Sequence, residues 1–212
     1  MTEASAGEGA ADLRLEAEQA IADGDLARGS YLCVRLGEIF EADGDSEGAE
    51  SAFRQAVVLA RQVDADDPEL MLVAFVNLSD FLAPSDESVA LAGELTANII
   101  DRREMYHPMR AADAAYYQVN VMLQLAEIDP SRICEVLEVA KNAVKMCDDV
   151  CFHNMAQDIQ RKVAATLNVL GCDAEASQWQ AEADKYKDWA VFMNQEIPGH
   201  VHLWNIHPSG MG

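Results

Sequence analysis

Apolar residues recur every three or four positions along almost the whole chain, and short groups of turn residues separate these runs. Near the start, for example, Leu13, Ala17 and Ala20 are spaced so that they share one face of a helix. No stretch shows the alternation of apolar and polar residues that is typical of a half-buried strand. The pattern therefore predicts an all-helical protein. The expected helices cover residues 11–22, 26–42, 45–61, 67–82, 86–102, 109–127, 129–146, 150–170 and 173–192.

Turn and capping residues mark the helix boundaries. The string Ala-Asp-Gly-Asp occurs at residues 22–25 and again at 42–45. In each copy the glycine suits the left-handed backbone conformation at a helix end, and the second aspartate suits the N-cap of the next helix. Pro68 and Pro130 each follow an aspartate, which indicates a helix start, and Gly171 predicts one more tight turn. The spacing of these signals indicates helical hairpins in series.

The packing of one such hairpin is visible in residues 33–56. Small residues would let its two helices approach closely across the turn, while large ones fill the space between them. The small positions are Gly37, Ala49 and Ala56, and the large ones are Leu36, Phe40 and Phe53. This stretch resembles a tetratricopeptide repeat unit. The resemblance continues with substitutions in residues 67–102, is loosest in residues 109–146 and is good again around Gly171.

The resemblance implies an all-α fold, a right-handed superhelix of about four antiparallel helix pairs with an extra N-terminal helix and a C-terminal extended tail. We expect residues 1–10 to be a disordered acidic lead, residues 11–193 to form the helical repeat domain, and residues 194–212 to be a tail that packs on the last helices. The tail contains Val201, Leu203 and Trp204, and an apolar tail is not expected to remain in water.

Charge limits the classes of partner. The chain has 15 Lys and Arg residues against 37 Asp and Glu residues, a formal net charge of −22. Such a protein repels phosphate backbones and anionic membrane surfaces, so nucleic acid and membrane are poor partners.

The first residues show no signal peptide, and the longest apolar stretch, residues 70–76, is too short to cross a bilayer. We therefore expect a cytoplasmic protein.

The resemblance also implies a binding surface, because in tetratricopeptide arrays the first helix of each pair lines the concave wall. Asp113, Tyr116 and Asn120 join this wall if the third pair keeps the register of the others. The wall residues taken from the other pairs are Tyr31, Val34, Glu38, Val76, Asp80, Asp158, Arg161 and Asn168.

The chemistry of this wall favours a polypeptide partner. Carboxylates suit the Lys or Arg side chains of a bound segment, Asn amides can pair with its backbone, and Tyr supplies apolar area. The resulting hypothesis is a non-enzymatic adaptor or chaperone-like scaffold that binds a protein or peptide with basic and apolar residues in an acidic concave groove. The alternative is that these residues form a solvated face. No catalytic motif or cofactor fingerprint occurs in the chain, so neither catalysis nor a cofactor is expected.

Two cysteine and histidine groups are weaker candidates. Cys147, Cys151 and His153 have types that bind zinc, but without a second tight pair the group favours buried structural thiols. The five cysteines are an odd number scattered through helical patterns, which favours reduced thiols over a disulfide framework.

The tail histidines His200, His202 and His207 could share a metal, but no carboxylate or cysteine lies among them, so we do not expect a metal site there. A separate alternative is that the tail, with His200, His202 and Trp204, docks on a neighbouring copy and makes a homo-oligomer.

Overall fold

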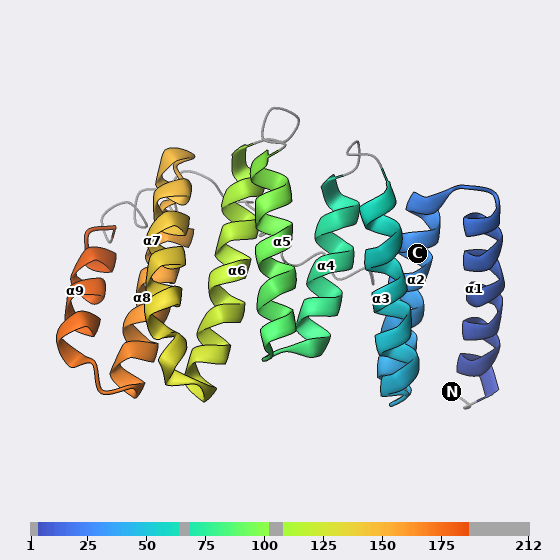
Figure 1. Ribbon diagram of the computed structural model, residues 1–212, viewed down its shortest axis with the longest axis horizontal. Coiled ribbons are helices and arrows are strands. Elements are labelled where there is room, and N and C mark those ends of the chain that lie inside the picture. Colours follow the sequence, from blue (N-terminus) through green and yellow to red (C-terminus); the bar gives the residue numbers. More distant parts are fainter. Residues whose placement is uncertain (1–3, 64–67, 102–107, 187–212) are drawn as a thin grey trace.

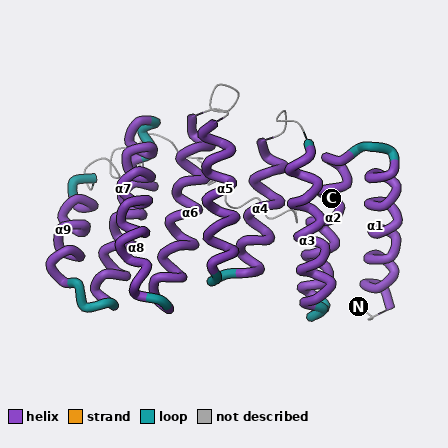
Figure 2. The backbone as a smooth tube through the Cα atoms, viewed as in Figure 1, coloured by secondary structure: helices purple, strands orange, loops and turns teal. Residues whose placement is uncertain are grey.

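The computed structural model describes residues 4–63, 68–101 and 108–186. Within these ranges the chain forms nine α-helices and one short 3-10 helix, and none of their residues is in a strand (Figure 2). The all-helical prediction is confirmed for this part of the chain. The elements are α1 (Ala4–Ala22), α2 (Leu26–Ala42), α3 (Ser46–Gln62), α4 (Pro68–Leu82), α5 (Asp86–Asp101), α6 (Pro108–Ile128), η1 (Pro130–Arg132), α7 (Ile133–Asp149), α8 (His153–Val169) and α9 (Asp173–Asp184).

The helices follow one another in chain order along the long axis of the molecule (Figure 1). Each helix packs against its neighbours in the chain, and α2 also contacts α4, as α6 contacts α8. This is a helical-repeat-like arrangement, because most of each helix's packing partners are close to it in sequence.

Capping residues fix the helix starts where the sequence predicted them. The Asp25 carboxylate accepts a hydrogen bond from the backbone N–H of Arg28 at 3.1 Å, and Asp45 accepts one from Gly48 at 2.9 Å. Helix α2 has the predicted bounds, and α3 begins directly after its Asp45 cap. These bonds satisfy backbone donors that the first turn of a helix would otherwise leave unpaired.

The α2–α3 turn requires a left-handed residue. Gly44 has a φ of 79°, and the turn closes with hydrogen bonds from Gly44 N–H to the Glu41 carbonyl and from Asp45 N–H to the Phe40 carbonyl. The α1–α2 and α8–α9 turns repeat this pattern of positive φ and two closing bonds. The α7–α8 turn does so as well, but there the left-handed position is occupied by Cys151, with a φ of 61°.

Some boundaries differ from the sequence predictions. Helix α1 begins at Ala4, so residues 4–10, expected to belong to a disordered lead, are helical, and Ala10 is part of the first hydrophobic core. Helix α8 begins at His153 and not at residue 150, because the Cys151 turn precedes it. The expected end of the last helix and the tail, residues 187–212, lie outside the described residues.

Helices α2 and α3 pack most closely at one glycine. A Cβ atom added to Gly37 would lie 2.4 Å from the Phe53 ring, and Phe53 is 1 % exposed. The hydroxyl of Ser30 donates a buried hydrogen bond of 2.9 Å to the carbonyl of Ala56 in the same interface. The small-against-large pairing predicted for residues 33–56 is therefore present.

Two hydrophobic cores meet at α6. Its residues Ala111, Ala114 and Tyr117 pack into the core formed with the first five helices. Ala112 and Ala115, on another side of the same helix, pack into the core formed with α7, α8 and α9. Because α6 belongs to both cores, it determines how the two halves of the chain are joined.

Candidate functional site

The eleven predicted wall residues all lie on α2, α4, α6 and α8. These four helices are also lateral neighbours, because α2 contacts α4, α6 contacts α8, and Tyr117 of α6 reaches α4. Nine of the eleven, together with Lys162, have at least partly accessible side chains, and we call these ten residues the even-helix face. Its members are Tyr31, Glu38, Val76, Asp80, Tyr116, Asn120, Asp158, Arg161, Lys162 and Asn168.

The remaining two predicted residues are buried. Val34 is 2 % exposed and belongs to the first hydrophobic core, so it cannot line an accessible wall. Asp113 is 8 % exposed, with its Oδ2 3.8 Å from the guanidinium of Arg110. Burial raises the pKa of Asp113, and the Arg110 charge only partly opposes this. Both residues are placed inward because the packing of neighbouring helices fixes the rotation of each helix about its axis.

A polar cluster joins α6 to α8. The hydroxyl of Tyr116 donates to Asp158 Oδ2 at 2.5 Å and accepts from Lys162 Nζ at 2.8 Å. Lys162 also donates to Asn120 Oδ1 at 2.8 Å and pairs with Asp158 at 2.7 Å. Its ammonium group lies 4.8 Å from the centre of the Tyr116 ring, within range of a cation–π contact. One pair of side chains on α6 and one on α8, distant from each other in sequence, are thereby held in one geometry.

The electrostatics of this cluster keep its donors and acceptors fixed. Desolvation and the hydrogen bond to Asp158 raise the pKa of Tyr116, so the phenol stays protonated at neutral pH. Desolvation alone would lower the pKa of Lys162, but its bonds to Asp158 and Tyr116 outweigh this and raise that pKa. The cluster therefore presents one carboxylate, one ammonium group and one amide, each already oriented by its neighbours.

A second polar contact joins α4 to α6. The hydroxyl of Tyr117, a residue that is 7 % exposed, donates to Asp80 Oδ1 at 2.6 Å. It also lies 3.3 Å from the carbonyl oxygen of Val76. Desolvation raises the pKa of Asp80, although the bond from Tyr117 works in the opposite direction. This contact fixes the position of the Asp80 carboxylate on the even-helix face.

Sequence reasoning missed Lys162 and Tyr117. Lys162 follows Asp158 by four residues on one helix, a spacing that brings opposite charges together, so a sequence signal existed. Tyr117 offered no such signal. Adjacent residues on a helix point about 100° apart, so Tyr116 reaches α8 while Tyr117 reaches α4, and the sequence does not reveal which tyrosine faces which helix.

The two sets of helices differ in charge. The four helices α2, α4, α6 and α8 carry seven acidic and five basic residues, a net charge of −2. Helices α1, α3, α5, α7 and α9 carry eighteen acidic and five basic residues, a net charge of −13. The negative charge of the described helices is therefore concentrated on α1, α3, α5, α7 and α9, and the acidity of the wall itself stays a prediction.

The weak zinc candidate of Cys147, Cys151 and His153 does not converge, and of its two thiols only Cys147 is buried as expected. Cys147 is fully buried in the second core, whereas Cys151 is exposed in the turn, and His153 Nδ1 lies 3.2 Å from Asp148 Oδ1. Burial raises the pKa of Cys147 to about 12, assisted by the charges of Asp148 and Asp113. Across the ranges that the structure describes, no three His, Cys, Asp or Glu side chains are arranged as metal ligands.

Two further features bear on partners. The tail histidines and Trp204 lie beyond residue 186 and thus outside the described residues. Among the described helices, none combines the length and the apolar character that a membrane span requires.

Comparisons with known proteins add little. No protein-family model matches the chain, and no curated protein matches it. The crystal structure of BtubC (BKLC) from P. vanneervenii is similar over 94 % of this chain and 93 % of that chain, with 16 % sequence identity and a TM-score of 0.29. A likeness at that TM-score supports no conclusion about the function of this chain.

Proposed function

We propose that this chain is a non-enzymatic, tetratricopeptide-like interaction module that holds a segment of a partner polypeptide against the even-helix face. In this proposal α2–α3, α4–α5, α6–α7 and α8–α9 are four antiparallel pairs of a right-handed superhelix, and the even-helix face is its concave wall. The chain acts as an adaptor or a chaperone-like scaffold.

The observation that carries the proposal is the pre-arranged polar cluster of Tyr116, Asn120, Asp158 and Lys162. Accessible polar side chains on a helix surface usually keep several rotamers, and ordering them on binding costs about 0.5 to 1.5 kcal/mol each. Here α6 and α8 hold these four before any partner arrives. A surface whose side chains are already ordered loses less conformational entropy on binding, so it is suited to recognition.

The chemistry of the face suits a segment with mixed character. Asp80 can receive a basic side chain, as can Glu38 and Asp158 beside their present partners Arg35 and Lys162. The second Nδ2 hydrogen of Asn120 and the amide of Asn168 can pair with a peptide backbone, and Tyr31 supplies apolar area. The net charge of −22 would attract such a basic partner from a distance, while the nearly neutral face makes the short-range contacts.

A displayed library of random peptides, selected on the intact protein, tests this function. Selected peptides should contain Lys or Arg together with aliphatic residues, and their affinity can be measured by calorimetry. The double variant Glu38→Gln/Asp158→Asn should lose at least about tenfold in affinity, because each removed carboxylate pairs with a charged donor.

A matched control is available on the other helices. The variant Glu47→Gln/Glu138→Gln removes the same two charges from α3 and α7. It should bind the selected peptides as the unmodified protein does, apart from a small effect of net charge. Equal losses in both double variants would show that only overall charge matters, and the even-helix face would then not be the binding surface.

A further inference from the structure

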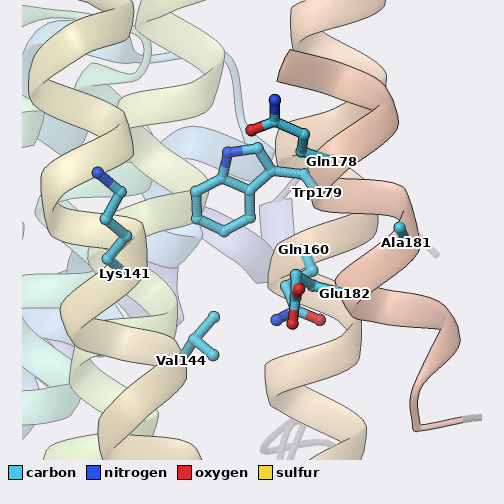
Figure 3. Close-up of a pocket in the computed structure, with 7 residues that line it drawn as sticks. All are labelled: Lys141, Val144, Gln160, Gln178, Trp179, Ala181 and Glu182. Atoms are coloured by element: carbon cyan, nitrogen blue, oxygen red, sulfur yellow. The ribbon is translucent and has the colours of Figure 1, made fainter. Parts of the chain in front are cut away.

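A separate pocket lies between α7, α8 and α9, with a volume of about 490 Å³. Figure 3 shows the Trp179 indole projecting from α9 toward α7, which supplies Lys141 and Val144 to the opposite wall. Gln160 comes from α8. This volume falls in the range of small-ligand sites, which accept one side chain or one small molecule.

One polar group in this pocket lacks a partner. Gln160 is 5 % exposed, and its Oε1 atom has no hydrogen-bond partner among the residues that the structure describes. A buried acceptor without a donor costs about 1 to 3 kcal/mol. Gln160 lines the pocket, and rotation about its broad terminal torsion exchanges the places of the amide oxygen and nitrogen, so either atom can face a ligand there. The pocket therefore offers an acceptor that needs a donor.

The other lining groups favour a flat cation. Trp is the best aromatic partner for a cation–π contact. Glu182 places a carboxylate at the same wall, where it also pairs with Lys185 at 2.5 Å. Helix α9 as a whole has four acidic residues and no basic one. Lys141 is the opposing charge, but its ammonium group lies 3.0 Å from Glu138 Oε1 and is partly neutralised there.

We propose that this pocket binds a guanidinium group, with its plane stacked on Trp179 and one N–H donated to Gln160 Oε1. Guanidinium is planar and carries five N–H donors, whereas an ammonium group cannot stack and an uncharged urea lacks the attraction to Glu182. Val144 and Ala181 supply apolar contact for the aliphatic stem of an arginine. The site is independent of the proposed function, because Gln160 lies on α8 about 200° from Asp158.

The test uses the full chain and four probes: N-acetylarginine amide, free arginine, N-acetyllysine amide and N-acetylcitrulline amide. Binding is followed by NMR of the Trp179 indole N–H, assigned with Trp179→Phe. N-acetylarginine amide should shift this resonance saturably, and the lysine and citrulline probes should bind at least about tenfold more weakly. If N-acetylarginine amide binds tightly and free arginine does not, the natural ligand is an arginine within a polypeptide. If free arginine binds equally well, the natural ligand is the free amino acid.

Gln160→Leu should weaken N-acetylarginine amide by about tenfold, while the matched change Gln180→Leu, outside the pocket lining, should leave its affinity unchanged. Circular dichroism checks that both variants fold, and Gln160→Leu is expected to fold because it removes an unsatisfied polar atom. The proposal is overturned if the arginine probe causes no saturable shift, if citrulline binds equally well, or if Gln160→Leu binds as the unmodified protein does.

Discussion

The α2–α3 hairpin and the α7–α9 end both consist of packed helices joined by tight turns. They differ in how fully turn conformation and buried hydrogen bonds are satisfied. In α2–α3 the left-handed turn position is a glycine, and the buried Ser30 hydroxyl has a carbonyl partner. At the α7–α9 end the corresponding turn position is Cys151, and the buried Oε1 atom of Gln160, a pocket-lining residue, has no hydrogen-bond partner within the described part of the chain.

The difference separates a region that is optimised for stability from one that is not. A hairpin in which local conformation, packing and hydrogen bonding all agree is optimised for folding. Departures from these rules tend to gather at functional sites, where the strain or the unpaired group has a use. The buried interface between α2 and α3 therefore has an architectural role, while the proposed guanidinium pocket lies at the end where these rules are less fully met.

The largest expected effect is in the tight hairpin. Gly37→Ala should lower the free energy of unfolding by about 2 to 3 kcal/mol, because its Cβ would overlap the buried Phe53 ring. The control is Gly93→Ala on α5, where the nearest atom to the new Cβ is Gln118 Nε2 at 3.4 Å. That change should raise stability by about 0.5 to 1 kcal/mol through helix propensity. Urea denaturation measures both, and equal effects would contradict the close packing at Gly37.

A smaller effect is expected from exchanging the turn residues. Cys151→Gly should stabilise the protein by about 0.5 to 1 kcal/mol, because glycine adopts a positive φ without steric cost. Gly44→Ala should destabilise it by about 1 kcal/mol for the same reason. Thermal unfolding of the two variants should give shifts of opposite sign. Shifts of the same sign would mean that the two turns are not equivalent.

The smallest expected effect depends on pH and concerns Asp113, whose charge lies near Cys147. Its pKa is raised in the folded protein, so folding favours the protonated form, and stability is lost as pH rises from about 4 through the raised pKa. Asp113→Asn removes this loss. The variant should have the higher Tm at pH 7, and the difference should shrink toward pH 4. A difference that is constant with pH would exclude titration of Asp113 as its cause.

The sequence allowed accurate prediction of local features. The bounds of α2, the Asp25 and Asp45 caps and the Gly44 turn were all predictable, because they depend on residues within one or two helical turns. The pairing of Gly37 with Phe53 was predictable too, since a short turn leaves neighbouring helices few ways to pack. Nine of the eleven wall residues were also accessible, because helical spacing separates exposed from buried positions reasonably well.

The sequence by itself thus determined that the chain is helical, where its helices begin and turn, and how negative it is. Only the tertiary structure decided that Val34 and Asp113 face inward and that Tyr116 and Tyr117 bond to different helices. The physical reason is that capping and turn formation are local, whereas the rotation of a helix about its own axis is set by all the helices packed around it.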